Sequence, residues 1–397
     1  MKTVYVDNNA TTAIAPEVLE AMQPYFKTDY FNPSSMYEAA RSSARAIQQA
    51  RQTIARCIGA GDPEQILFTG SATESNNAAL FGTVQANPQR CHIITSAVEH
   101  PSVFEVCTEL QRRGMDVDFL PVDRQGELVL DDFIKVLRND TLLVSIMLAN
   151  NETGVCYPVA ELARIAKETS AEIIFHTDAT QAVGKLPVAL HGDLKHVDLL
   201  SFSGHKLHAP KGVGALFVRR GARWRPFMLG GHQEGGRRAG TENVPYIVGL
   251  ARACELAVAG LHDEQTRVRS LRDRLQQALE EQIPAIEVNG RGAKRLPNTL
   301  NLAIHGIEGE SILAELSRNG ICASSGSACT SGSLEPSHVL KAMAVPFTAI
   351  HGSLRISLSR YNNEEDVERI IKTLPGIVAN LRRLSPYWDD DRNCLAV

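Results

Sequence analysis

Seven short apolar runs constrain the fold more than any other feature of the sequence. Most of them are apolar throughout, which is typical of strands that are buried on both faces of a parallel sheet. Helical patterns, such as the one at 161–170, separate several of the runs. This order predicts a doubly wound α/β fold with a mostly parallel seven-stranded sheet flanked by helices. The runs are 65–68, 92–95, 117–122, 142–149, 172–175, 197–202 and 214–218.

The length of the chain predicts a second domain. At 397 residues it exceeds what one hydrophobic core usually supports. Residues 268–283 place apolar side chains on one helical stripe and are expected to lead the chain out of the large domain. Short strand-like runs and helices follow. We predict a large α/β domain over 15–260 and a smaller α+β domain formed by 1–14 and 261–397.

The composition argues against several classes of function. Hydrophobic residues make up 44% of the chain, charged residues 22%, and the formal net charge is −4. Nothing here indicates binding to nucleic acid or to a membrane surface. No apolar run has the length of a bilayer span, and residues 1–12 lack the apolar core of a signal peptide. We therefore expect a soluble, cytoplasmic protein. The eight cysteines show no CxxC arrangement and no zinc-ligand spacing, so in a reducing cytoplasm most of them should be small buried hydrophobic residues.

Polar residues follow five of the predicted strands. Ligands of open α/β sheets bind beyond the carboxyl ends of the strands, which is where these residues would lie. One such residue would be unremarkable, but five strand ends that deliver polar side chains to one rim predict a binding site. The five segments are 69–77, 96–102, 150–154, 176–181 and 203–206.

Three of these segments indicate a pyridoxal phosphate site. Residues 69–77 place small hydroxyl side chains at a helix start, where free N–H groups favour a phosphate, although an ordinary helix cap is the alternative. Asp178 follows a buried strand and needs a cationic partner, which a protonated ring nitrogen would supply. Lys206 is a candidate for a Schiff base, with a surface salt bridge as its alternative. A phosphate-binding helix start, an acid for the ring nitrogen and a lysine for the Schiff base are the groups that a pyridoxal phosphate site requires.

Cys329 stands apart from the other cysteines. It lies in the segment SSGSACTSG (324–332), whose small and polar side chains cannot bury it in a core. Gly326 and Gly332 add backbone freedom, so we predict a mobile loop over about 322–334. A thiol in such a loop is a candidate nucleophile in its thiolate form.

The sequence resembles the group I cysteine desulfurases of the NifS type, which are fold-type I pyridoxal phosphate enzymes related to the class V aminotransferases. The resemblance implies that the sulfur of L-cysteine is transferred to Cys329 as a persulfide, leaving L-alanine, and then serves iron–sulfur cluster assembly. It runs from 5–12 to 357–361, and its most specific motifs are SFSGHKLHAPKGVG (201–214), GGHQEGGRRAGTEN (230–243) and SSGSACTSGSLEPSHV (324–339).

The resemblance implies a role for each site residue. Lys206 would hold the cofactor covalently and move the Cα proton, and His100 would stack on the ring and assist proton transfer. Asp178 would pair with the pyridine nitrogen, and Gln181 would hydrogen-bond the ring hydroxyl. Further cofactor contacts would come from Ala72, Thr73, Asn151, Ser203, His205 and, from the other subunit of a homodimer, Thr241.

The resemblance also implies how substrate and acceptor are bound. Arg355, with Asn8 and Asn32 nearby, would clamp the substrate carboxylate, because a guanidinium matches a carboxylate bidentately. The acceptor would be an iron–sulfur scaffold protein that faces the loop and the C-terminal region. Cys329 is the one candidate for a transient iron–sulfur ligand, and no resident metal is predicted.

Details of the sequence distinguish it within the family. The segments 336–339, 346–348 and 385–388 look more like the nitrogen-fixation type than the housekeeping type. The sequence departs from the commonest family pattern at three positions near the site, namely Phe31, Tyr37 and Ser71.

Alternatives to a desulfurase remain at this stage. A selenocysteine lyase on the same scaffold would use the same motifs. A class V aminotransferase would not need Cys329, and a non-catalytic assembly partner would not need Lys206, Asp178 and Cys329 to be intact.

Overall fold

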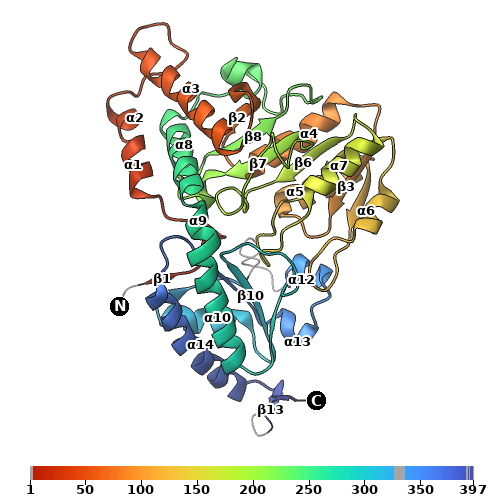
Figure 1. Cartoon of the computed structure of the whole chain (residues 1–397), viewed down its shortest axis with the longest axis vertical. Coiled ribbons are helices and arrows are strands. Elements are labelled where there is room, and N and C mark those ends of the chain that lie inside the picture. Colours follow the sequence, from red (N-terminus) through yellow and green to blue (C-terminus); the bar gives the residue numbers. More distant parts are fainter. Residues whose placement is uncertain (1–2, 326–335, 390–391, 393, 397) are drawn as a thin grey trace.

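The computed structural model describes residues 3–325, 336–389, 392 and 394–396 (Figure 1). Cys329 and most of the predicted loop at 322–334 lie outside the described residues. Within the described part, no single helix is long and apolar enough to span a membrane. The helical stretches Val244–Ala259 and Leu261–Gln282 meet the length and composition criteria only as a pair, bent by 53°.

A seven-stranded sheet forms the centre of the larger part of the fold, in the order β2-β8-β7-β6-β5-β3-β4. Five adjacent strands, β7, β6, β5, β3 and β4, are parallel to one another. Strand β8 is antiparallel to both of its neighbours, β7 and β2. The predicted mostly parallel seven-stranded sheet is therefore confirmed. The strands are β2 Ile66–Thr69, β3 His92–Ser96, β4 Asp116–Leu120, β5 Thr141–Ser145, β6 Ile174–Asp178, β7 Leu199–Ser203 and β8 Gly214–Val218.

Helices cover both faces of this sheet, as Figure 1 shows. Alternate residues of the strands therefore enter different clusters: Leu199 and Leu216 pack on one face, and Leu200 and Phe217 on the other. Burial of each such side chain contributes about 1.5–3 kcal/mol. The helices of this part are α1 Pro16–Met22, α2 Pro24–Lys27, α3 Ala40–Cys57, η1 Pro63–Gln65, α4 Ala72–Ala86, α5 Pro101–Arg112, α6 Leu130–Val136, α7 Val159–Thr169, η2 Gly204–Lys206, η3 Gln233–Gly236 and α8 Val244–Ala259.

Most of the remaining elements pack around a three-stranded antiparallel sheet of order β12-β10-β9, whereas the apolar residues of 338–350 join the cluster of the larger part. The hydrophobic cluster of the three-stranded sheet includes the predicted stripe of 268–283 and also Val4 and Val6 of the N-terminus. The N-terminus reaches it because β1 pairs in parallel with β11. The predicted domain boundaries stay a prediction. These elements are β1 Val4–Tyr5, α9 Leu261–Asp263, η4 Glu264–Val268, α10 Arg269–Gln282, β9 Ile286–Val288, β10 Thr299–Ile304, α11 Gly309–Arg318, β11 Ile321–Cys322, α12 His338–Ala342, α13 Phe347–Ile350, β12 Ser353–Ser357, α14 Glu364–Arg383, β13 Trp388–Asp389 and β14 Cys394–Leu395.

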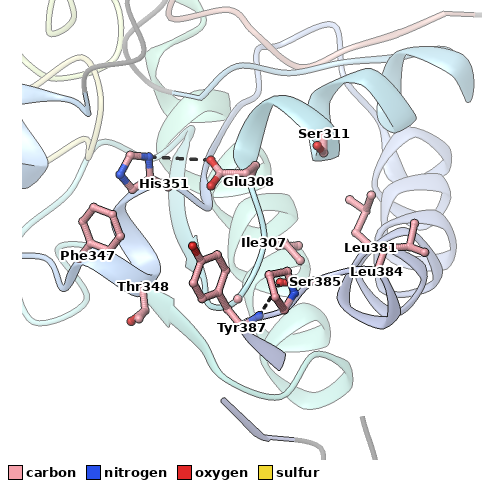
Figure 2. A pocket seen from close by; sticks show the side chains of 12 residues that line it. Ile307, Glu308, Ser311, Phe347, Thr348, His351, Leu381, Leu384, Ser385 and Tyr387 are labelled. Carbon is pink, nitrogen blue, oxygen red and sulfur yellow. Dashed lines mark hydrogen bonds and ion pairs between the residues drawn. The ribbon is translucent and has the colours of Figure 1, made fainter. Parts of the chain in front are cut away.

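An apolar pocket of about 400 Å³ lies in this C-terminal part (Figure 2). His351 and Glu308 form an ion pair in its wall, with 3.8 Å between Nδ1 and Oε2. Phe347, Leu384 and Tyr387 line the pocket and are largely exposed. The pocket is lined by none of the described site residues predicted from the sequence.

Candidate active site

A second pocket, of about 420 Å³, opens at the carboxyl ends of the sheet strands. Many polar groups converge in it, which distinguishes it from the apolar pocket of similar volume. Ten of the predicted site residues line it: Ala72, Thr73, His100, Asn151, Asp178, Gln181, Ser203, His205, Lys206 and Arg355. Seven other residues complete the wall: Asn9, Ala10, Ser71, Ser102, Met147, Ala149 and Thr180.

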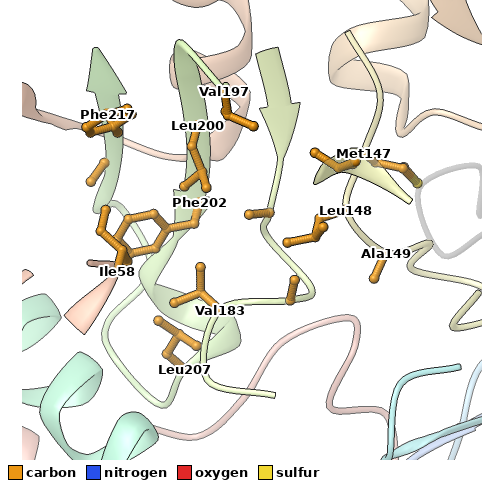
Figure 3. Close-up of a cluster of buried hydrophobic side chains, with 14 of the residues drawn as sticks. Ile58, Met147, Leu148, Ala149, Val183, Val197, Leu200, Phe202, Leu207 and Phe217 are labelled. Carbon is orange, nitrogen blue, oxygen red and sulfur yellow. The ribbon is translucent and has the colours of Figure 1, made fainter. Parts of the chain in front are cut away.

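A packed hydrophobic cluster supports the pocket from below. The apolar run 142–149 is longer than β5, which ends at Ser145. Its last residues therefore extend beyond the carboxyl end of the strand. Met147 and Ala149 belong both to this cluster and to the pocket wall. Figure 3 shows them with Val183 and Leu207 beside the strand residues. Because protein cores are close-packed, this support holds the polar groups above it in fixed positions.

Lys206 ends the short helix η2, directly after β7. Its Nζ atom donates hydrogen bonds to the backbone carbonyls of Asn9, at 2.6 Å, and Ala10, at 2.7 Å. The lysine was predictable from the sequence, whereas these two acceptors were not. The N-terminal segment therefore forms one wall of the site and holds the amine there.

Asp178 ends β6 and is only 6% exposed. Its Oδ2 atom accepts from the Nδ2 atom of Asn76 at 2.7 Å, and its Oδ1 atom accepts from the backbone N–H of Thr180 at 2.8 Å. Asn76 also donates to the hydroxyl of Ser102 at 2.8 Å. These donors compensate part of the cost of burying a carboxylate and leave it able to bind a cationic ring nitrogen.

His100 caps the N-terminus of α5. Its Nδ1 atom accepts from the backbone N–H of Ser102 at 3.1 Å and lies 2.8 Å from the hydroxyl of that residue. Burial lowers the pKa of His100, the charge of Asp178 opposes this shift, and Lys206 adds to it. The imidazole is therefore neutral near pH 7, as a proton acceptor must be.

The start of α4 is a candidate anion site. Ser71 caps the helix by accepting from the backbone N–H of Glu74, so the N–H groups of Ala72 and Thr73 have no partner within the helix. A Cβ atom on Gly214 would lie 2.7 Å from the carbonyl carbon of Ser71, so glycine is what allows β8 to pass behind this helix start.

The other side of this anion site is formed by Ser203 and His205. Burial, then the charge of Lys206, lowers the pKa of His205 to about 3, so it acts as a neutral hydrogen-bonding group. Neutral donors and a helix N-terminus suit a phosphate. With an acid, an amine and a phosphate site in one pocket, the residues fit pyridoxal phosphate.

Arg355 lies on β12 with 2% of its surface exposed. Its Nη2 atom is 2.8 Å from the Oδ1 atom of Asp7, and its Nη1 atom donates to the carbonyl of Asn151 at 3.0 Å. The guanidinium is thus fixed at the pocket wall by groups from two distant segments. This position suits a group that binds a substrate carboxylate.

Three of the predicted site residues that the structure describes do not line this pocket. Asn8 is buried behind it and donates to the carbonyl of Ser357 at 2.9 Å. Asn32 is exposed and accepts from the backbone N–H of Ser34. Thr241 is exposed on the segment 230–243. Their predicted roles stay predictions.

The segment that carries Thr241 is anchored by two ion pairs. Arg51 holds Glu234 at 2.7 Å between Nη2 and Oε1, with both side chains buried. Arg238 binds Glu74, in the first turn of α4, at 2.8 Å. The segment is therefore fixed to the same helix whose start forms the anion site.

The three departures from the family pattern lie in two places. Ser71 is the cap of α4 and lines the pocket. Phe31 contacts Tyr37 edge to face, with 6.0 Å between ring centroids, outside the pocket wall. A change at Ser71 would therefore reach the anion site directly, whereas Phe31 and Tyr37 contact each other outside it.

His176 gives the fold a predicted acid sensitivity. It is fully buried in β6 between the hydroxyls of Ser145 and Ser201, and burial lowers its pKa to about 4. In the unfolded chain a histidine has a pKa of about 6.5. The unfolded state therefore binds a proton that the folded state does not, and the stability present above this pH is lost as the pH falls toward 4. The free energy of unfolding, measured with urea, should fall between pH 7 and pH 4.5. This fall should be about 2 kcal/mol smaller for His176→Gln than for wild type.

The control for this prediction is His191→Gln, at an exposed position. It should keep the wild-type pH dependence. Equal losses in wild type and His176→Gln would show that His176 does not titrate in this range.

Comparison with known proteins places the chain in a family. The class-V aminotransferase model matches residues 4–370. A cysteine desulfurase of Trichormus azollae is 51% identical over 395 residues, covering 100% of this chain and 98% of that protein. The cysteine desulfurase NifS of Azotobacter vinelandii is 50% identical over 388 residues, covering 98% and 96%. A solved NifS-like protein superimposes with a TM-score of 0.89 at 38% identity, covering 96% of this chain and 100% of that one. The chain therefore belongs to the class-V aminotransferase family, as the resemblance in its sequence predicted.

Proposed function

We propose that the protein is a cysteine desulfurase, which uses pyridoxal phosphate to move the sulfur of L-cysteine to Cys329 and leaves L-alanine. The observation that carries the proposal is the convergence of Lys206, Asp178 and the start of α4 in one pocket. The relatives named as cysteine desulfurases, which match over nearly the whole chain, support it.

The pocket offers a partner for each part of the cofactor. Ala72, Thr73, Ser203 and His205 would bind the phosphate. Lys206 would hold the cofactor covalently. Asp178 would pair with the ring nitrogen, Gln181 would donate to the ring hydroxyl, and His100 and Asn151 would also contact the cofactor. When bound, pyridoxal phosphate supplies an electron sink that lets the Cα proton of an amino acid leave.

The protein's own groups would orient the substrate and move its protons. Arg355 would hold the carboxylate of L-cysteine. The Nζ atom of Lys206, in its neutral form, would accept the Cα proton, and His100 would assist at its ring nitrogen. Neither step works with a permanently protonated base, and burial lowers the pKa of His100, which keeps its imidazole neutral.

Sulfur transfer then requires a thiolate. The Sγ atom of Cys329 would attack the substrate sulfur, so that a new S–S bond forms while the C–S bond breaks. The electron pair of the broken bond stays with the carbon skeleton, which takes up a proton to become alanine. Overall, the thiol of Cys329 and the substrate L-cysteine are converted into a persulfide on Cys329 and L-alanine.

The proposal extends to partners. We expect a homodimer, in which Thr241 of one subunit reaches the cofactor phosphate of the other. We expect an iron–sulfur scaffold protein as the sulfur acceptor, serving nitrogenase maturation, in the cytoplasm. The exposed apolar side chains of the C-terminal pocket, among them Phe347 and Leu384, would suit a protein acceptor (Figure 2).

Product analysis tests the proposal. The purified protein, loaded with pyridoxal phosphate, is incubated with L-cysteine and a reductant, and alanine and sulfide are quantified. We expect equal amounts of both. Formation of alanine from selenocysteine but not from cysteine would favour a selenocysteine lyase. If neither alanine nor sulfide formed, a non-catalytic role would be favoured.

A further inference from the structure

Lys185 is a buried lysine that lies behind the site and has no part in the proposed reaction. It is 6% exposed, and its Nζ atom donates to the Oε1 atom of Gln181 at 2.9 Å. An ammonium group has only donors, so this bond determines which end of the Gln181 amide is the oxygen. The Nε2 atom then donates to the carbonyl of Asn9 at 3.0 Å. The same carbonyl accepts from Lys206.

Gln181 therefore connects two lysines through the N-terminal segment. Its Nε2 atom carries two hydrogens, of which one goes to Asn9. Gln181 also lines the active-site pocket. The second N–H is thus left for an acceptor in the pocket, while the amide oxygen is held by Lys185.

Glu264 provides the negative charge for Lys185. It is 7% exposed and begins η4, a π-helical turn, a local distortion that is frequent at functional sites. Gln265 of the same turn donates from its side chain to the carbonyl of Lys185, which fixes the two segments together. Among the described residues, Lys185 and Glu264 form no direct ion pair, and the Oε2 atom of Glu264 has no hydrogen-bond partner.

A small cavity separates these two groups. Its volume is about 20 Å³, enough for one water molecule, and Lys185, Glu264, Lys206, His208 and Arg360 line it. A water there would have a carboxylate and an ammonium as partners. The cavity also lies against Lys206, so the buried charges adjoin the amine of the active site.

We propose that Lys185, balanced by Glu264 across this cavity, is a positioning residue that keeps the N–H group of Gln181 directed toward the cofactor. This inference rests on the proposed function, because it assumes that Gln181 donates to the ring oxygen of pyridoxal phosphate. The residue acts only through Gln181 and touches no reacting atom.

Charge keeps Lys185 a donor near neutral pH. Burial lowers its pKa to about 8, and Glu264 limits this shift. At pH 7 the amine therefore remains mostly protonated. The other charged or titratable groups that face it are Arg355, Arg360, Lys206, His205 and His208.

The test measures the pH midpoint of the visible absorption of the bound cofactor, which reports the proton affinity of its linkage to Lys206. Without its ammonium partner, as in Lys185→Met, the Gln181 amide can turn its oxygen toward the ring oxygen. Loss of that donor hydrogen bond should raise the midpoint by about half to one pH unit. Gln181→Leu should raise it by a similar amount.

A double-mutant cycle separates positioning from a general effect on stability. If Lys185 acts through Gln181, adding Lys185→Met to Gln181→Leu should produce no further shift. Equal additional shifts in both backgrounds, or an unchanged midpoint in folded Lys185→Met, would overturn the proposal. The control is Lys167→Met, which removes another largely buried lysine, paired with Asp198 at 2.6 Å, and should lower stability without moving the midpoint.

Two further outcomes are distinguishable. If Lys185→Met does not fold, Glu264→Gln is measured instead. It should shift the midpoint in the wild-type background and not in the Gln181→Leu background, and any other pattern would overturn the proposal. If the wild-type protein shows no cofactor absorption after loading, the proposed function itself fails, and this inference fails with it.

Discussion

With Cys329 replaced by alanine, sulfide release from L-cysteine is expected to fall by about 10³-fold or more, and alanine should be lost with it. The attacking group would be gone, whereas cofactor binding and substrate binding use other residues. The variant should therefore keep the visible absorption of the loaded protein and its spectral response to L-cysteine. Rates of alanine and sulfide formation, measured on the same samples, check the prediction.

Cys91→Ala is the matched control, because Cys91 is also a free cysteine and is exposed. It should retain the wild-type rate. If Cys329→Ala still produced alanine at the wild-type rate, sulfur removal would not depend on this thiol. A selenocysteine lyase would then become the better assignment.

Lys206→Ala is expected to lower kcat/KM for L-cysteine by about 10³-fold or more. General-base catalysis by a positioned side chain contributes about 10²–10⁴-fold, and this variant also removes the covalent link to the cofactor. Borohydride reduction of the loaded protein, followed by mass analysis of the peptides, should locate the cofactor on Lys206 in wild type and on no peptide of the variant.

The variant should also be less stable when measured without cofactor. The carbonyl of Ala10 would lose its hydrogen bond from Lys206, and that of Asn9 would keep only the bond from Gln181, which costs about 1–3 kcal/mol in total. Lys211→Ala, at an exposed position five residues further on, is the control and should leave activity and stability unchanged. A fully active Lys206→Ala protein would refute the proposed reaction.

The sheet was predictable because its strands are apolar on both faces, so their runs are continuous in the sequence. The polar residues after β6 and β7 were predictable for a related reason. In a parallel sheet the carboxyl ends of neighbouring strands meet at one edge, so Asp178 and Lys206 lie near each other whatever the intervening helices are.

The partners of these residues were not predictable from local sequence. Asn76 binds Asp178 across 102 positions of the chain, and Asn9 binds Lys206 across 197. Such contacts depend on how helices and segments pack, which no spacing rule gives. In the N-terminal segment, Asn9 and Ala10 line the pocket, whereas Asn8 is buried behind it on Ser357 and Asn362. Residues 8–10 form a turn, in which the backbone N–H of Ala10 donates to the carbonyl of Asp7, and within this turn a difference of one position separates wall from support.

The N-terminal wall of the site has a consequence for synthesis of the protein in the cell. Residues 4 and 5 leave the ribosome long before their strand partner, Ile321–Cys322, is made. At about 5–20 residues per second, roughly 15–60 s pass before that partner exists. Until then the carbonyls that hold Lys206 have no fixed position. The cofactor site is therefore completed only after β11 has been made, and nascent chains truncated before β11 should not retain pyridoxal phosphate.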